Sequence, residues 1–468
     1  MKKIGLVSLG CPKNLVDSEV MLGMVEQAGH AITADAADAD VLVVNTCAFI
    51  DRAKQESIDA ILEMAELKGQ QRGRRLIVTG CLAERYRDEL KKEIPEIDAV
   101  LGTGEVPAIL AAIGDGPAEA GQPIGTRPLA FYKRGLGGDL TQAMTPRFGI
   151  DLPEYLYDAD TPRRLATPGH YAYLKIAEGC DYKCAFCIIP KMRGHYRSRT
   201  HESIVREAHA LASRGVKELL LISQDTTFYG IDRKERGALP RLLRQLNAVH
   251  GIEWIRLLYL YPTTISAEVI DAMAECDKVC KYIDLPLQHA SDAVLARMKR
   301  PGTRASYERL LTNIRARIPN VALRTTFIVG FPGETEEDFD QLMDFVRGVG
   351  FDHLGVFTYS HEEGTSAFGL TDDVPARVKK RRQSALMARQ KGLVIKRHRA
   401  RLGDRAKVMV DGPSPEQFLV LQGRLEGQAP DIDPVVYLTG VDAALAAGRL
   451  IDVEIVGSKE YDLVARPL

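Results

Sequence analysis

Three cysteines at CxxxCxxC spacing, Cys180, Cys184 and Cys187, follow a strand-like segment that runs from Tyr171 to Ile176. Three thiolates on one short loop can bind three irons of a four-iron cluster and leave the fourth iron open to a small molecule, whereas most protein clusters take four cysteines. The alternative is a zinc site with His195 as the fourth ligand, but structural zinc usually takes its ligands from two paired clusters. The spacing therefore favours an iron-sulfur site with one open iron.

Three further cysteines, Cys11, Cys47 and Cys81, each lie within two residues of the end of a short apolar run. We expect the runs to be strands of a parallel sheet flanked by helices, and they are Ile4 to Leu9, Val41 to Asn45, Leu76 to Thr79 and Ala99 to Leu101. Because the carboxyl ends of parallel strands share one edge of a sheet, the three thiols should meet there in a metal site. Separate buried thiols are the alternative, since cysteine is common in cores.

A second series of strand and helix units extends from Tyr171 to about Arg401 and predicts a partial (β/α)6 barrel, with function at the carboxyl ends of its strands. The expected strands are Tyr171 to Ile176, Glu218 to Ser223, Trp254 to Tyr259, Tyr282 to Leu287, Ala322 to Val329 and His353 to Tyr359. Polar residues follow these strands, among them Gln224, Gln288 and the GFPGE loop from Gly330 to Glu334. That loop lacks the GK[ST] ending of a nucleotide-binding P-loop.

Five short β-rich runs end the chain and predict a small five-stranded barrel. The runs are Ala406 to Val410, Phe418 to Leu421, Val435 to Leu438, Leu450 to Val456 and Tyr461 to Val464. Residues 114–168 are rich in Gly and Pro and indicate a linker. The sequence is thus divided into an N-terminal α/β domain (1–113), the linker (114–168), the central barrel (169–401) and the C-terminal barrel (402–468).

The bulk composition excludes several classes of protein. With 468 residues, 45% of them hydrophobic and 27% charged, the chain has the composition of an ordinary soluble protein. A net charge of −1 gives no global attraction to nucleic acid or membrane. No apolar run approaches the length of a transmembrane helix or of a secretory signal, so we expect a cytoplasmic protein that makes no membrane contact.

Taken together, these motifs resemble the methylthiotransferases of the radical S-adenosylmethionine (SAM) superfamily. The resemblance implies that the open iron beside Cys180, Cys184 and Cys187 binds SAM, that Cys11, Cys47 and Cys81 bind a second 4Fe-4S cluster, and that the last barrel is a TRAM domain. It also implies SAM contacts at the loop and strand-end residues, namely Phe186, Gln224, Gln288, Gly330, Gly333 and Glu334.

Within that family, the segments SLGCPKNLVDSE, AYLKIAEGCDYKCAFCIIP and RLLYLYP look most like the class that modifies the twelfth protein of the small ribosomal subunit. The implied reaction uses one SAM as methyl donor and another as radical source, abstracts hydrogen from the β-carbon of an aspartate and adds methylsulfide there. A reductant protein, which the sequence does not identify, supplies electrons. The alternatives are the sibling class that modifies a transfer RNA adenosine, and a non-enzymatic iron-sulfur sensor.

Local charge bears on the substrate. Residues 402–468 hold six basic and eleven acidic side chains, a net of 6 − 11 = −5, which suits a basic ribosomal protein better than RNA. Residues 376–401 hold eleven Lys and Arg and no acid, including the run Lys379 to Arg382. This run indicates either contact with nucleic acid or the charged outer face of a helix. Contact with ribosomal RNA, during modification of an assembled subunit, would reconcile the two signs.

Overall fold

The computed structural model describes residues 1–114, 152–416, 420–441 and 445–468, which form two compact units. The first unit comprises residues 1–166, 178–197 and 360–369, and the second comprises residues 167–177, 198–359 and 370–468. Each unit is described separately below. No helix among the described residues is long and apolar enough to cross a membrane.

The first unit is built on a five-stranded parallel sheet of order β2-β1-β3-β4-β5. Its strands are β1 (Lys3–Ser8), β2 (Ala31–Thr33), β3 (Val41–Thr46), β4 (Arg75–Gly80) and β5 (Ala99–Leu101). Its helices are α1 (Pro12–Gln27), α2 (Asp51–Gly69), α3 (Cys81–Arg85), α4 (Arg87–Glu93), α5 (Ile109–Ile113) and α6 (Ile189–Arg193). The strand β3 is buried along its whole length, as parallel strands covered on both faces usually are.

Two distant segments complete this unit. The helix α6, which follows the CxxxCxxC loop, places Ile188 and Met192 in the same apolar core as Cys81. The segment 360–369 is attached through the buried ion pair between Arg85 Nη1 and Glu362 Oε2, at 3.1 Å. The loop with the three closely spaced cysteines therefore packs with the N-terminal sheet.

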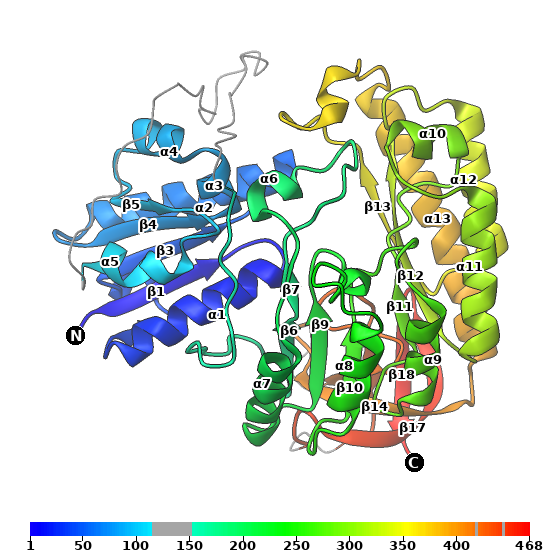
Figure 1. Cartoon of the computed structure of the whole chain (residues 1–468). Coiled ribbons are helices and arrows are strands. Elements are labelled where there is room, and N and C mark those ends of the chain that lie inside the picture. Colours follow the sequence, from blue (N-terminus) through cyan, green and yellow to red (C-terminus); the bar gives the residue numbers. More distant parts are fainter. Residues whose placement is uncertain (115–151, 417–419, 442–444) are drawn as a thin grey trace. The chain divides into compact units, whose positions relative to one another are not determined.

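The second unit contains six parallel strands in two three-stranded sheets, of orders β10-β9-β6 and β11-β12-β13 (Figure 1). The bridge between Ile255 and Val279 and the hydrogen bond from Leu260 N to Asp284 O (2.9 Å) join the two sheets into a partial barrel. The strands are β6 (Tyr171–Lys175), β9 (Glu218–Ile222), β10 (Trp254–Leu257), β11 (Tyr282–Asp284), β12 (Ala322–Val329) and β13 (His353–Thr358). The helices are α7 (His201–Ser213), α8 (Ala238–Asn247), α9 (Ala267–Glu275), α10 (Asp292–Arg297), α11 (Arg304–Arg317), α12 (Glu336–Val349) and α13 (Ala376–Ala400). Two-residue strands, β7 (Ala177–Glu178) and β8 (Arg197–Ser198), lie on either side of the CxxxCxxC loop and α6 in the chain.

A closed five-stranded barrel of order β14-β15-β16-β18-β17 ends the second unit and confirms the predicted fold class. Its strands are β14 (Arg405–Pro413), β15 (Leu421–Leu425), β16 (Val436–Leu438), β17 (Leu450–Lys459) and β18 (Asp462–Pro467). For the second strand, β15 begins at Leu421, the last residue of the predicted run Phe418 to Leu421, and extends four residues beyond it. Residues 418–419 of that run lie outside the described residues. Gly423, a residue type depleted in strands, weakened the sequence signal of this strand.

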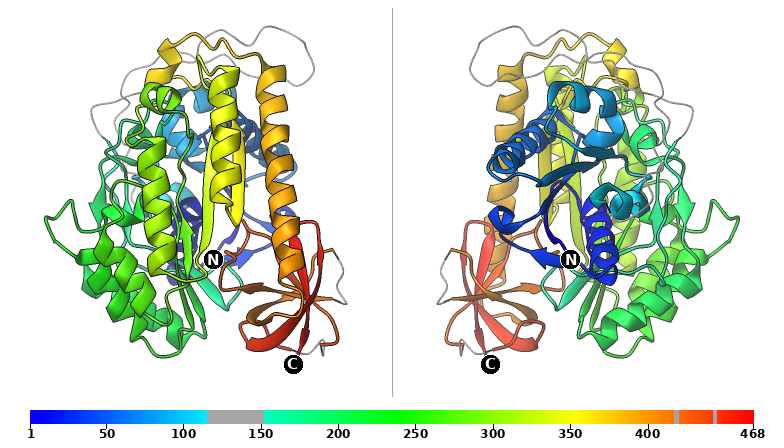
Figure 2. Two further views of the ribbon diagram at one scale, coloured as in Figure 1. Left: turned by 90° about the vertical axis from the view of Figure 1, so that its right-hand side faces the viewer. Right: turned by 90° about the vertical axis from the view of Figure 1, so that its left-hand side faces the viewer.

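The small barrel docks against the starts of the central strands through buried polar contacts. Arg424 Nη1 donates to Glu218 Oε2 at the first residue of β9 (2.6 Å). The Tyr282 hydroxyl, at the first residue of β11, donates to Asp433 Oδ2 (2.7 Å). The long helix α13 also reaches the barrel (Figure 2). There Lys391 Nζ bonds Glu460 Oε1 (2.8 Å). These contacts place the small barrel at the starts of the central strands. Function is expected at the other end, where the strands finish.

Candidate functional site

The three N-terminal cysteines follow three neighbouring strands and meet at one edge of the sheet. Cys11 is the N-cap of α1, Cys47 follows β3 directly, and Cys81 is the first residue of α3 after β4. A Cβ atom added at Gly10, whose φ is +89°, would lie 2.9 Å from Cys47 Sγ, so a glycine is required where these two loops approach each other. The expectation that the strand ends bring these loops together therefore agrees with the geometry.

Hydrogen bonds from side chains to the backbone hold the loops in place. Asn14 Nδ2, in the first turn of α1, donates to Leu9 O (2.7 Å) and Thr46 O (3.2 Å) and so connects the ends of β1 and β3. Ser57 of α2 accepts from Cys47 N and donates to Cys47 O, both at 2.9 Å. These contacts fix the ends of β1 and β3 and the backbone of Cys47.

The thiols influence one another's protonation. Burial raises the pKa of Cys81 to about 12, while Arg193 acts to lower it and Cys47 and Cys11 act to raise it. Burial also raises the pKa of Cys47, and the neighbouring Cys11 adds to that effect. The raised pKa values keep the Cys47 and Cys81 thiols protonated near neutral pH, so binding iron to them must displace protons.

Arg193, the last residue of α6, is the cation that faces these sulfurs. Its Nη2 lies 3.6 Å from Cys81 Sγ and donates to Asn14 Oδ1 (3.0 Å). Its Nη1 pairs with Asp17 Oδ2 (2.5 Å) and Glu178 Oε2 (3.4 Å). The guanidinium is buried, because its side chain is only 3% exposed.

The second cysteine triplet lies on the loop between Glu178 and α6. Cys187 N donates to Cys184 O (3.1 Å), which forms a backbone turn between these two cysteines, and Cys180 N donates to Gly194 O (3.1 Å), at the end of α6. Phe186 is half-buried between them in the chain. His195, the zinc-ligand alternative, is 78% exposed and its Nδ1 bonds Asp181 Oδ1 at 2.8 Å.

Both triplets fit iron-sulfur clusters by the chemistry of their donors. All eight cysteines lie in the described part of the chain and none forms a disulfide. No group of His, Cys, Asp or Glu among the described residues surrounds one point as the ligands of a single ion do. In a four-iron cluster, each thiolate instead binds a different iron, which spaces the sulfurs more widely.

The residues predicted to contact SAM in the second unit all lie where central strands end. Gln224 is half-buried two residues after β9, and Gln288 has a φ of +73° and bridges Phe327 of β12. Gly330, directly after β12, has a φ of +76°, and Gly333 N donates to Asp373 Oδ1 (2.7 Å).

The Glu334 side chain bonds the backbone of the loop in which it lies. Its carboxylate accepts from Gly330 N (2.5 Å) and Phe331 N (3.0 Å) and pairs with Arg382 Nη1 (3.1 Å). Burial raises the pKa of this carboxyl group to about 7, against the lowering effect of Arg382. The described contacts give Glu334 a structural role, and contact with SAM remains a prediction for it.

The sequence patterns missed three residues of the cysteine sites. They are Asn14, Ser57 and Arg193. Asn14 lies in a segment that is distinctive only by its family resemblance, and Arg193 lies in the basic stretch KMRGHYRSR, where nothing distinguishes it from a surface arginine. Only the packing of α6 reveals its role.

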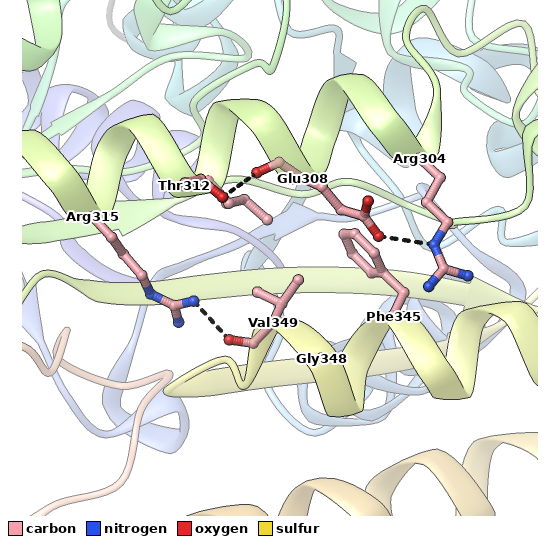
Figure 3. Close-up of a pocket in the computed structure, with 8 residues that line it drawn as sticks. Arg304, Glu308, Thr312, Arg315, Phe345, Gly348 and Val349 are labelled. Atoms are coloured by element: carbon pink, nitrogen blue, oxygen red, sulfur yellow. Dashed lines mark hydrogen bonds and ion pairs between the residues drawn. The ribbon is translucent and has the colours of Figure 1, made fainter.

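A groove of about 350 Å³ lies between α11 and α12 and contains none of the predicted site residues (Figure 3). Its polar groups bond one another, since Arg304 Nε pairs with Glu308 Oε1 (2.9 Å) and Arg315 Nη1 donates to Val349 O (2.7 Å). We therefore assign no chemistry to it.

The acidic surplus of the small barrel is partly directed inward. Asp431 accepts from the Tyr171 hydroxyl (3.0 Å), and Glu426 accepts from Lys281 N (2.6 Å). Asp433 and Asp411 likewise bond central-barrel side chains. These four of the eleven acids bond groups at or next to the starts of the central strands, and the net of −5 overstates the charge that a partner meets.

Three family descriptions match the chain: an uncharacterised protein family, UPF0004, at residues 3–102, the radical SAM superfamily at 174–346 and the TRAM domain at 402–468. Among solved structures, the radical SAM methyltransferase TsrM of Kitasatospora setae superposes with a TM-score of 0.54, at 17% identity, over 76% of this chain and 72% of its own. The cobalamin-dependent radical enzyme OxsB superposes with a TM-score of 0.52, at 11% identity, over 84% of this chain and 56% of its own. At these identities the likeness shows the fold alone.

Curated relatives match over nearly the whole length. The ribosomal protein uS12 methylthiotransferase RimO of Koribacter versatilis is 49% identical over 100% of this chain and 96% of its own. The RimO proteins of Trichlorobacter lovleyi (46%, over 99% and 98%) and Myxococcus xanthus (47%, over 99% and 91%) are similarly close. The predicted resemblance to radical SAM methylthiotransferases is confirmed, and the chain belongs to the RimO family of these enzymes.

Proposed function

We propose that this chain methylthiolates the β-carbon of an aspartate in ribosomal protein uS12, with SAM as both methyl donor and radical source. The observation that carries the proposal is the 49% identity to a uS12 methylthiotransferase over the full chain. The cysteine geometry supports it, because both triplets belong to one compact unit.

Cys180, Cys184 and Cys187 would hold the cluster that generates the radical, and Cys11, Cys47 and Cys81 would hold the auxiliary cluster. When bound, the clusters and SAM supply electrons, the radical and the sulfur for the reaction. The chain's own part is to hold the two sets of thiolates and to exclude water. Phe186, Gln224, Gln288, Gly330, Gly333 and Glu334 are the proposed SAM contacts.

Each of the four segments has its own proposed part. Residues 1–113 would hold the auxiliary cluster, and residues 114–168 would form the linker. Residues 169–401 would carry the radical chemistry, and residues 402–468 would form the TRAM barrel. The substrate would be uS12, free or within the small subunit, in the cytoplasm. A separate reductant protein would supply the electrons.

Ribosomal RNA is a proposed second contact. The run Lys379 to Arg382 points to it, but Lys379 pairs with Asp372 (2.6 Å) and Arg382 pairs with Glu334 (3.1 Å), and both are buried. The contact would therefore fall on the exposed cations of α13, which are Arg377, Lys380, Arg381, Arg389, Lys396 and Arg399.

Anaerobic reconstitution with iron, sulfide, SAM, dithionite and either purified uS12 or small subunits tests the proposal. We expect uS12 to gain the mass of a methylthio group in place of one hydrogen, located on an aspartate by fragmentation. Transfer RNA assayed in parallel should remain unmodified. Methylthio-adenosine in the transfer RNA with unmodified uS12 would establish the alternative substrate.

Cysteine variants separate the two sites in the same assay. Cys180→Ala should abolish 5′-deoxyadenosine formation. Cys81→Ala should still form 5′-deoxyadenosine but give no methylthiolated uS12, with a loss of about four irons per chain. Cys276→Ala, in a buried cysteine at the end of α9, is the matched control and should keep both activities. Unchanged iron in Cys81→Ala would remove the auxiliary site.

A further inference from the structure

The helix α6 follows the loop that carries Cys180, Cys184 and Cys187, which we call the radical cluster loop. This helix contributes a side chain to the other triplet, Cys11, Cys47 and Cys81. Arg193 ends α6, yet its guanidinium contacts Asp17, Asn14 and Cys81, all of which belong to the N-terminal sheet and its helices. The remaining contact, Glu178, precedes the radical cluster loop. One buried side chain therefore joins the segments that carry the two triplets.

The geometry of these contacts requires arginine. The planar fork of a guanidinium can donate in several fixed directions at once, whereas an ammonium is a point charge on a flexible stem. Arg193 uses Nη1 for the carboxylates of Asp17 and Glu178 and Nη2 for Asn14 and the Cys81 sulfur. A lysine would keep the charge but could not reach all four groups.

An N–H group near a ligating sulfur has a known physical effect. Hydrogen bonds to cluster sulfurs are among the factors that set the reduction potential, because they stabilise the added negative charge of the reduced cluster. Outer contacts to ligands also fix ligand orientation and strengthen metal binding.

We propose that Arg193 is a positioning residue of the auxiliary cluster, which it stabilises and makes easier to reduce through its contact with Cys81. This inference rests on the proposed assignment of Cys11, Cys47 and Cys81 as ligands. Arg193 adds a specific function to α6, since the loop that carries one cluster then influences the potential of the other.

The alternative is that Arg193 only neutralises Asp17 and Glu178 and serves the fold. A buried arginine elsewhere provides the matched control. Arg199 Nη1 pairs with Glu207 Oε2 (2.6 Å), and both side chains are buried in the second unit. Its replacement removes a comparable ion pair without touching a cysteine site.

The test uses the full chain with Cys180, Cys184 and Cys187 replaced by alanine, so that only the auxiliary cluster forms. Arg193→Lys, Arg193→Met and Arg199→Met are added to this parent, and circular dichroism checks their folding. We measure iron per chain, the rate of iron release to a chelator, and the midpoint potential from the paramagnetic signal of the reduced cluster.

We expect both Arg193 variants to release iron about ten times faster than the parent, and Arg193→Lys, which keeps the charge, to shift the midpoint to lower potential. Arg199→Met should match the parent in both measurements. An Arg193→Lys protein with the parent's release rate and potential overturns the inference alone. A folded parent that binds no iron overturns the auxiliary site itself, and the inference with it.

Discussion

Glu334 illustrates how a single buried carboxylate holds a functional loop. It accepts two backbone N–H groups of the GFPGE turn and pairs with Arg382 of α13, while burial raises its pKa to about 7. His289 Nε2 lies 3.9 Å from Glu334 Oε2, and burial lowers the pKa of His289 to about 3, so the histidine stays neutral. The loop therefore contains one group that titrates near neutral pH.

The titration of Glu334 predicts a pH-dependent stability. In the unfolded chain the carboxyl group loses its proton near its usual value of 4.5, but in the folded chain it keeps the proton to about 7. The folded state binds more protons between these values, so stability falls as the pH rises through that window. We expect the free energy of unfolding to drop from about pH 5 to about pH 8, by at most an amount on the order of 3 kcal/mol from this group.

Denaturant titrations at several pH values measure the slope of the free energy of unfolding against pH. Glu334→Gln should remove the contribution, whereas Glu308→Gln, in a glutamate whose side chain is 48% exposed, should retain the wild-type slope. Identical slopes for wild type and Glu334→Gln would contradict the assignment.

At the scale of elements, α13 shows why a charge run cannot be interpreted from composition. The two ends of the KKRR run are buried in ion pairs, and Leu386 and Val394 pack on the same side of the helix. The other cations of α13 named above are exposed. The helix with a charged outer face, one of the two interpretations of this run, is confirmed, and RNA contact by that face remains a proposal.

Replacing Arg389, Lys396 and Arg399 together by alanine should weaken binding to small ribosomal subunits and reduce its salt dependence. The slope of log affinity against log salt should fall by about one for every side chain among the three that pairs with a phosphate. Binding assays over a series of salt concentrations measure this slope. Arg309, Arg317 and Arg347, exposed on α11 and α12, provide a control triple of equal charge. An equal weakening in the control triple would show that net charge alone is responsible.

Most strands could be predicted because their signals are local. Continuous apolar runs such as Val41 to Val44 and the short β-rich runs of the small barrel need no distant contact to be recognised. The strand β2 was missed because it has only three half-buried residues. The strand β15 was misplaced because its pairing with β14 and β16, rather than its propensity, decides its position.

At the scale of the whole molecule, the second unit joins the central barrel and the small barrel through buried charge. Arg424 pairs with Glu218 (2.6 Å) and Asp411 (2.9 Å), and His170 Nε2 lies 2.8 Å from Asp411 Oδ1. The contacts lie where the central strands begin, whereas the predicted SAM residues follow where they end. The small barrel therefore lies at the end of the central strands opposite to those residues.

Removing Arg424 should weaken the attachment of the small barrel to the central barrel and lower the free energy of unfolding. Arg424→Met leaves Asp411 and one oxygen of Glu218 without the guanidinium, and breaking a buried ion pair in this way costs about 3–5 kcal/mol. Arg466→Met breaks the ion pair between Arg466 and Glu454, in which the Arg466 side chain is 61% exposed. This change should lower the free energy of unfolding by at most about 1 kcal/mol. Denaturant unfolding of the two variants measures the difference, and similar losses would show that the interface charge does not hold the barrels together.

The sequence by itself determined the chemistry of this protein. Cysteine spacing, strand-end positions and barrel patterns depend on neighbours a few residues apart, and they were sufficient to predict the family and the fold class. The tertiary structure decided which groups meet. Arg193 reaches Cys81 across 112 positions, and Arg424 reaches Glu218 across 206. Such pairs form only when separate elements pack, and a charged side chain is drawn into the interior only where packing places its partner, so no local pattern predicts them.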